Sequence, residues 1–304
     1  MPQTIVITQA NVVGSGNNTF EYNFPSTQTF KNASIAVCSA SMYYSWYNIS
    51  AALNNNSFQY TIPYWNGAAN TTITRTVTIP DGLYNISDIN NYLQYDMISA
   101  GWYYTLSTGS NVYFAEFIIN PTRYAVQINT YATGTALPAG ASYPSGGFGN
   151  NAAFTLPTVN ADASITILAT NDFYKIIGFT SPTYTLPYTT PVVLIQTQSF
   201  LSNIAPQVQP NPSALVAISN IDNKFANPSS IIYSITPNVG IGSLIIEKTP
   251  EFNYNKLLSG SYNRIRLQLL GSASLAPLQN ADPNICIMLV IKDESEDILD
   301  KFRR

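Results

Sequence analysis

Hydrophobic and polar residues alternate along much of this chain, and the alternation predicts strands with one buried face. Residues 19–24 read Thr-Phe-Glu-Tyr-Asn-Phe, and Pro25 then ends the run. A longer candidate is Lys31–Tyr47, Arg264–Leu269 alternates over six residues, and Ile285–Ile291 is apolar throughout. Because such runs recur and strong helix formers are scarce, the sequence predicts a mainly β protein.

One segment departs from this alternation and predicts the clearest helix in the chain. Its apolar residues recur at helical spacing, at Ile86, Ile89, Leu93 and Met97. Asn85 or Ser87 is placed to cap the first turn, and Asp88 lies where the positive end of a helix favours a carboxylate. A second, shorter helix is predicted at Asn171–Ile177.

The distribution of these patterns divides the chain into three parts. Strand-like runs dominate both ends, whereas the middle mixes strands with the two helices. We therefore expect a jelly-roll β-sandwich built from residues 1–56 and 190–291, with an inserted α+β segment over residues 57–189. Residues 292–304 form a charged C-terminal tail.

A long neutral stretch lies inside the predicted insert. No charged residue stands between Arg123 and Asp162, and Ala132–Asn151 is dense in small residues and proline. This composition predicts an exposed or interface loop, and its neutrality favours the interface. Gly146–Gly149 is too short for a phosphate-binding loop, and we interpret it as a flexible loop within this neutral stretch.

Charge is scarce and unevenly placed. The sequence has 13 Lys and Arg and 16 Asp and Glu, and nine of these residues lie in 292–304. A surface with so few charges is unusual for a soluble monomer, which suggests that other subunits cover much of it. The net charge of -3 also argues against sequence-specific nucleic-acid binding.

The chemistry needed for catalysis is poorly represented. Histidine is absent, so Ser-His-Asp hydrolysis and histidine-based zinc sites cannot be built. The few acids before the tail form no recognisable pair, and Asp81 fits a turn. We predict no enzyme activity, small-molecule substrate, cofactor or metal. Cys38 and Cys286 are interpreted as buried free thiols, with a disulfide as the alternative.

An aromatic cluster follows the long strand candidate. Tyr43, Tyr44, Trp46 and Tyr47 lie within seven residues of one another. Such rings can stack on a sugar, or they can pack in a subunit contact, where aromatic residues are enriched. We favour the contact and predict these four residues as interface residues.

The tail supplies a second predicted contact. Ile298, Leu299 and Phe302 share one face of a helix, and Arg303 and Arg304 follow them. A frayed, solvated end is the alternative. As an arm, the tail would dock its apolar stripe on a neighbouring subunit while the two arginines reach an acidic partner or the genome. Deleting residues 292–304 should then weaken assembly.

Several stretches together resemble one family, the penton or minor capsid proteins of virophages and of the related Maverick/Polinton elements, and the Mavirus-like group in particular. They are Phe30–Val37, Tyr43–Ile49, Thr78–Leu93, Lys175–Phe179 and Arg264–Ile291. The resemblance implies a jelly-roll subunit that forms homopentamers at the vertices of an icosahedral shell. It also implies contact with trimers of a double jelly-roll major capsid protein, no catalytic residues, and a place in the virion after assembly inside the host cell.

A function from another class stays open. A glycan-binding jelly-roll module of a tail fibre or lectin would also use exposed Tyr and Trp rings. Selective binding on a glycan array would favour it, and a host-surface glycan is a partner that a vertex protein could also have.

Overall fold

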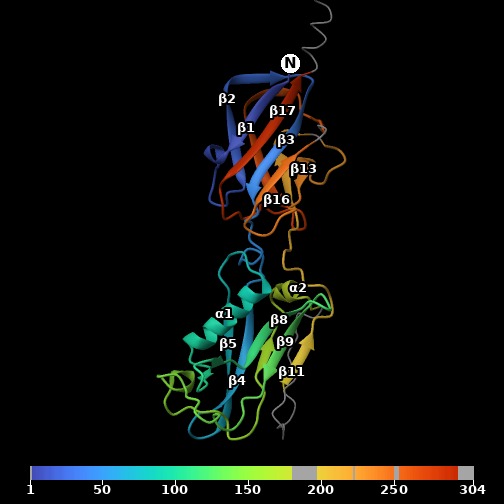
Figure 1. Ribbon diagram of the computed structural model, residues 1–304. Helices are drawn as coiled ribbons and strands as arrows, with labels where there is room; N and C mark the ends of the chain where they lie inside the picture. The colour runs from blue at the N-terminus through green and yellow to red at the C-terminus, as the bar shows by residue number, and fades with distance from the viewer. Residues whose placement is uncertain (1, 180–196, 222, 250–252, 294–304) are drawn as a thin grey trace, which may run out of the picture. The chain divides into compact units, whose positions relative to one another are not determined.

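The computed structural model describes residues 2–179, 197–221, 223–249 and 253–293. The chain forms two compact units (Figure 1). Met1–Tyr47 and Pro210–Arg304 make the first, and Asn48–Gln209 makes the second, here called the insert. No helix among the described residues has the length and apolar character to cross a membrane.

The unit boundaries differ from the predicted ones at residues 56 and 190. The first unit ends at Tyr47 and resumes only at Pro210. Strand pairing is the reason, since β11 (Thr197–Leu201) pairs antiparallel with β9 (Ala125–Tyr131) of the insert. A strand that the predicted boundaries assign to the jelly roll therefore belongs to the insert.

The described residues of the first unit form eight main strands that pair in a nested order. They are β1 (Gln3–Thr8), β2 (Thr19–Phe30), β3 (Ala33–Tyr43), β12 (Ala214–Ile218), β13 (Ile231–Ile235), β14 (Leu244–Lys248), β16 (Gly260–Gly271) and β17 (Ile285–Asp293). The first strand pairs with the last, the second with the second-last, the third with the third-last, and the central two pair with each other. This is the pairing of a jelly roll, and it confirms the predicted fold class.

The nested strands form two sheets. One has the order β1-β17-β3-β14, with the short β15 (Asn255–Lys256) also pairing with β3, and the other has the order β13-β12-β16-β2. The 3-10 helix η1 (Gln9–Asn11) follows β1. In Figure 1, β1, β17 and β3 lie side by side in this unit.

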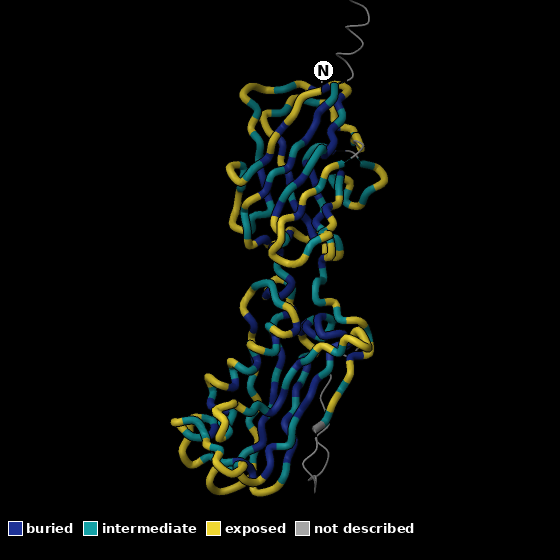
Figure 2. The backbone as a smooth tube through the Cα atoms, in the orientation of Figure 1, coloured by how far each residue is buried: buried dark blue, intermediate teal, exposed yellow. Residues whose placement is uncertain are grey.

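The core of the jelly roll lies between its two sheets. Ile7, Ile35 and Ile287 contribute from one sheet, and Val216 and Leu267 from the other, each fully buried. Figure 2 shows these strands as dark buried stretches between exposed loops. Alternate residues of β1 and β16 thus bury one face, which is the pattern that the sequence predicts for strands.

The described residues of the insert form three small sheets and two α-helices. The sheets have the orders β10-β4-β5, β11-β9-β8 and β6-β7. The remaining elements are β4 (Ser57–Trp65), β5 (Asn70–Thr78), α1 (Ile86–Ser99), β6 (Tyr104–Thr105), β7 (Asn111–Val112), β8 (Ala115–Asn120), η2 (Phe148–Asn150), β10 (Ser164–Thr166) and α2 (Phe173–Ile177). This composition confirms an α+β insert within a mainly β chain.

Helix α1 begins as the sequence predicts. The Asn85 side chain accepts from the Asp88 N–H, and the Asp88 carboxylate accepts from the Asn85 N–H, which makes a capping box. The four apolar residues at helical spacing are the buried ones. Propensity, capping and burial therefore agree in this element.

Aromatic side chains fill the core of the insert. The Phe58 ring packs on Phe117 and Phe173, with ring centroids 5.2 and 4.9 Å apart. Phe148 is fully buried and meets the Trp102 ring edge-on at 5.1 Å. The loop at 146–149 is therefore anchored in the core, whereas the sequence predicted a flexible loop. The buried residue, Phe148, is a single aromatic residue among glycines, so no periodic hydrophobic pattern indicates its burial.

In each unit, one side chain forms hydrogen bonds that join the first and last chain segments next to the unit boundary. In the jelly roll, Trp46 Nε1–H donates to the Asn211 carbonyl at 2.9 Å. In the insert, Asn48 Nδ2–H donates to the carbonyls of Tyr84 and Val208 at 2.6 and 2.7 Å. Each unit thus closes its own ends with its own hydrogen bonds.

Candidate interaction surface and pocket

The outer side of the β1-β17-β3-β14 sheet carries little charge and is here called the neutral face. Strand register places its outward side chains in rows across the sheet. The rows are Thr8, Cys286, Ser41 and Ile246; then Val6, Met288, Ser39 and Lys248; and Tyr43 beside Leu244. Among the described outward side chains of this sheet, with β15 included, the charged ones are Lys248, Lys256 and Lys292, at the margins.

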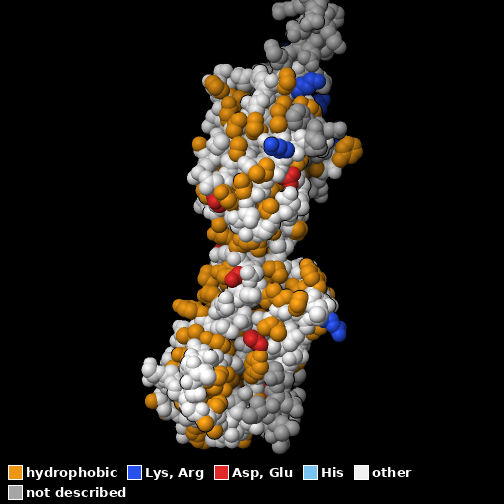
Figure 3. Space-filling view, viewed as in Figure 1, with side chains coloured by type: hydrophobic (Ala, Val, Ile, Leu, Met, Phe, Trp, Pro, Cys, Tyr) orange, Lys and Arg blue, Asp and Glu red, His pale blue; other side chains and the backbone are white. Residues whose placement is uncertain are grey.

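Large apolar side chains are exposed on the neutral face. Val6 is 43%, Leu244 42% and Ile246 57% exposed. A hollow of about 360 Å³ lies among Thr8, Ser41, Tyr43, Leu244 and Cys286. Figure 3 shows hydrophobic side chains spread over this unit with few charged ones between them. Exposed apolar groups with little charge are typical of the centre of a protein–protein interface.

The outer side of the other jelly-roll sheet is different. Arg264 and Arg266 of β16 lie outward next to Asn23 and Glu21 of β2. Arg264 Nη1 and Glu21 Oε2 form an ion pair at 3.1 Å. Exposed pairs of this kind keep a surface hydrated and add little to stability. The two sides of one sandwich thus differ in the chemistry that they present.

The structure separates the predicted tyrosine cluster into exposed and buried members. Tyr43 is 38% exposed on the neutral face, and Tyr44 and Tyr47 are half-buried. Trp46 is fully buried and packs on the Tyr44 ring with centroids 4.4 Å apart. Trp46 is therefore a core residue and has no surface to offer to a partner, which corrects its assignment as an interface residue.

The predicted tail contact, at Ile298, Leu299, Phe302, Arg303 and Arg304, lies outside the described residues.

The two cysteines are free thiols, as the sequence analysis favoured over a disulfide. Neither is fully buried, however. Cys286 lies opposite Ser41 in one of the outward rows of the neutral face. Cys38 lies where the pairing of β3 with β17 shifts register. Their apolar neighbours along the chain had suggested burial.

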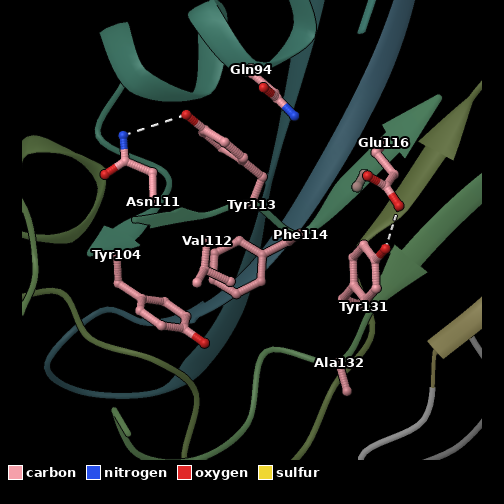
Figure 4. A pocket seen from close by; sticks show the side chains of 10 residues that line it. Gln94, Tyr104, Asn111, Val112, Tyr113, Phe114, Glu116, Tyr131 and Ala132 are labelled. Carbon is pink, nitrogen blue, oxygen red and sulfur yellow. Dashed lines mark hydrogen bonds between the residues drawn. The ribbon is translucent and has the colours of Figure 1, made fainter. Parts of the chain in front are cut away.

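A pocket of about 380 Å³ lies in the insert. Gln94 of α1 lines it, together with Tyr104 and Asn111 of the β6-β7 hairpin and with Tyr113, which directly follows the hairpin (Figure 4). Glu116 of β8 and Tyr131 of β9 complete the polar part of the lining. Its lining contains aromatic rings, two amide side chains and one carboxylate, and no Lys or Arg. Such a mixture of apolar surface and a few polar groups is typical of ligand sites.

Hydrogen bonds fix the orientation of Glu116. Its Oε1 accepts from Asn129 Nδ2–H at 2.8 Å and from the Tyr131 hydroxyl. Asn129 is held in turn by Gln127 and by Ser199, each donating to its Oδ1 at 2.8 Å. Oε2 of Glu116 accepts no hydrogen bond from the described residues. One carboxylate oxygen is therefore held in place while the other stays open.

Two tyrosines that line the pocket keep their protons at neutral pH. Burial, together with the hydrogen bond to Glu116, raises the pKa of Tyr131 to about 12. Burial also raises the pKa of Tyr104 above its ordinary value. Both phenols are thus hydrogen-bond donors under physiological conditions.

Another polar group of the insert is buried. Asp162 Oδ2 accepts from Gln198 Nε2–H at 2.5 Å, whereas its Oδ1 has no hydrogen-bond partner among the described residues. Burial raises the pKa of this carboxyl. In the described part of the chain, no group of three or more Cys, Asp and Glu side chains is placed to hold a metal ion.

The sequence analysis did not identify the pocket. Its residues come from separate segments that only the fold brings together. The local signal was Glu116, a carboxylate between Phe114 and Phe117 inside a strand-like run. A charge in such a run indicates a polar side of the sheet, but not its partners.

No protein-family model matches the chain, and no curated protein matches its sequence. Among solved structures, the chain is similar to the SeMet-labelled mavirus penton protein, with 11% identity and a TM-score of 0.42 over 96% of this chain and 98% of that one. It is also similar to a chain of the Sputnik virophage structure, with 12% identity and a TM-score of 0.39 over 97% and 99%. At these values, the function of this chain has to be argued from its own strand pairing and surface chemistry.

Proposed function

We propose that this chain is a structural protein of an icosahedral viral shell. Five copies associate into a vertex, and the vertex contacts trimers of the major capsid protein. Jelly rolls occur in viral capsid proteins, in lectins and in cupins. Cupin chemistry relies on histidine ligands, which this chain lacks. The neutral face is the observation that favours the capsid function.

The neutral face suits association because its burial costs little. Removing apolar side chains such as Leu244 and Ile246 from water is favourable, and Ser and Thr hydroxyls between them can pair across an interface. Few charges have to be desolvated. A fivefold ring needs two different complementary surfaces on each subunit, and the neutral face supplies one of them in this proposal.

The proposal has a direct test in the mass of the purified chain in solution. Light scattering after size-exclusion chromatography should give about five times the subunit mass of 33.3 kDa. The mass should persist as salt is raised, because screening weakens charge pairs and not apolar contacts. A species that stays monomeric at every concentration would contradict a self-assembling vertex.

The alternative function is a glycan-binding module of a tail fibre or lectin. A stable trimer in the same measurement would favour it over the vertex. The pocket lined by Glu116 and tyrosines is the observation that keeps it open. In either case the protein would act in the virion, after assembly in the host cell for the vertex function.

A further inference from the structure

We propose that the pocket between α1, the β6-β7 hairpin and strands β8 and β9 is a binding site for a neutral saccharide. The proposal concerns the insert alone and does not depend on the vertex function, which is attributed to the jelly roll.

The first argument is the open oxygen of Glu116. The donors Asn129 and Tyr131 both bond Oε1, so the carboxylate plane is fixed. Glu116 lines the pocket, and its Oε2 accepts no hydrogen bond from the described residues. A pre-oriented carboxylate that accepts from a hydroxyl makes a charge-assisted hydrogen bond, about twice as strong as a neutral one. A ligand gains this bond without paying to order the side chain.

The second argument is the charge of the pocket, which limits the ligand class. Glu116 has no ion-pair partner among the described residues, and the described lining contains no cation. A phosphate or carboxylate ligand would face an uncompensated like charge. Anionic ligands are therefore disfavoured, which leaves neutral and cationic ones.

Hydrogen-bonding capacity distinguishes neutral ligands from cationic ones. An ammonium group only donates, so it would satisfy Glu116 but leave the donors of the pocket without acceptors. Those donors are the amide of Gln94, which forms no hydrogen bond within the described chain, and the protonated phenol of Tyr104. Sugar hydroxyls both donate and accept, so they can satisfy all three groups.

The fourth argument is the apolar part of the wall. The rings of Tyr104 and Tyr113 and the side chain of Val112 line the same space (Figure 4). One side of a pyranose ring presents C–H groups that can pack on such rings. The volume of about 380 Å³ lies at the small end of the range of ligand sites, which suits one or two sugar rings.

The test uses the full-length chain and saturation-transfer-difference NMR. The probes are a mixture of neutral hexoses, N-acetylhexosamines and lactose, with methylammonium as a cationic probe and methyl phosphate as an anionic one. We expect saturation of the ring protons of at least one sugar and of neither ion. No transfer to any sugar at millimolar concentration, or transfer to methylammonium in its place, would overturn the saccharide assignment.

Two variants locate the site. Glu116→Gln keeps the shape but replaces the open acceptor by a donor, so sugar affinity should fall about tenfold or more. Its matched control is Glu247→Gln, at a jelly-roll carboxylate that also accepts from a tyrosine hydroxyl, Tyr233. If Glu116→Gln fails to fold, Gln94→Ala on α1 serves instead, with the exposed Asn91→Ala on the same helix as control. Unchanged binding in the folded pocket variant would place the sugar elsewhere.

Discussion

The jelly roll and the insert keep their polar and apolar groups in different places. The jelly roll buries mainly Ile, Leu and Val between two sheets and exposes further apolar side chains on its neutral face. The insert buries aromatic rings and holds a hydrogen-bonded polar network at the edge of a pocket. One unit therefore has a broad surface suited to association, and the other has a concave site suited to a small ligand.

The two proposed roles, association and ligand binding, therefore need not share residues. Jelly-roll sheets are closed by nested pairing, so their outward side chains are free to vary without loss of the core. Aromatic residues fill the irregular spaces between the small sheets and helices of the insert. Association and ligand binding can then be altered separately, and the predictions below test this separation.

Removing the insert should have the largest effect. Replacing residues 48–209 by a short Gly-Ser linker should leave a folded jelly roll, because Trp46 and Asn211 already hold its two chain ends together. The remaining jelly roll should assemble as the full chain does and lose all sugar binding. Circular dichroism, light scattering and NMR measure the three properties. A jelly roll that no longer unfolds cooperatively would show that the units are not independent.

A charge on the neutral face should have the next largest effect. Ser41→Glu puts a carboxylate between Cys286 and Ile246, where an interface would desolvate it without a partner. We expect assembly to weaken about 100-fold, since burying an unpaired charge costs about 3 kcal/mol. Light scattering over a concentration series measures this.

The matched control for that variant lies on the opposite sheet. Asn23→Glu introduces the same charge beside Arg264, where it stays hydrated and gains an opposite charge. Assembly should be unchanged, and sugar binding should be unchanged in both variants. Equal weakening by both would mean that the difference between the two sheet faces does not decide association.

The insert should lose stability when Asp96 is removed. The Asp96 carboxylate accepts from the buried Tyr60 hydroxyl at 2.7 Å and from Arg75 at 3.0 and 3.2 Å, which ties α1 to β4 and β5. Asp96→Ala leaves that hydroxyl unpaired and should lower the free energy of unfolding of the insert by about 2 kcal/mol. Urea unfolding followed by tryptophan fluorescence measures the loss.

A surface ion pair in the same unit provides the control. Asp172 and Lys175 are both nearly half exposed, and Asp172→Ala should change stability by less than about 0.5 kcal/mol. Unfolding of the jelly roll should not respond to either change. If the two variants cost the same, the bonds to Tyr60 and Arg75 contribute no more than an exposed pair.

Much of the fold could be predicted because its signals are local. The period of Ile86, Ile89, Leu93 and Met97 and the cap at Asn85 lie within one helix, and the strand alternation lies within each strand. The position of Trp46 could not be predicted in this way. Strand β3 ends at Tyr43, so the alternation no longer says which side a later residue faces.

The pocket and the place of β11 depend on partners distant in sequence. Glu116 and Tyr131 meet only because β8 and β9 pair in one register, and β11 joins β9 at a separation of about 70 residues. A hydrophobic pattern gives the side of a strand that is buried but not the strand beside it. The sequence indicated a shortage of charged residues, but it did not indicate which sheet would present the neutral face.

Alkaline pH should have the smallest effect, and the insert should show it most. The pKa of Tyr131 is raised from 10.0 to about 12 by burial and by Glu116, and that of Tyr60 is raised in the same direction. The folded state therefore binds these protons more tightly than the unfolded chain does. Their contribution to stability is fully present below pH 10 and is lost as pH rises toward 12.

Tyr131→Phe isolates one of these groups. The variant cannot ionise at this position, so its free energy of unfolding should fall less steeply between pH 10 and 12 than that of the parent chain. Tyr124→Phe, at a side chain 76% exposed, should follow the parent curve. Urea titrations at pH 8 to 12 measure the three slopes. Parallel curves for all three would mean that the Tyr131 hydroxyl is not held by Glu116, and the open oxygen on which the saccharide site depends would then lose its support.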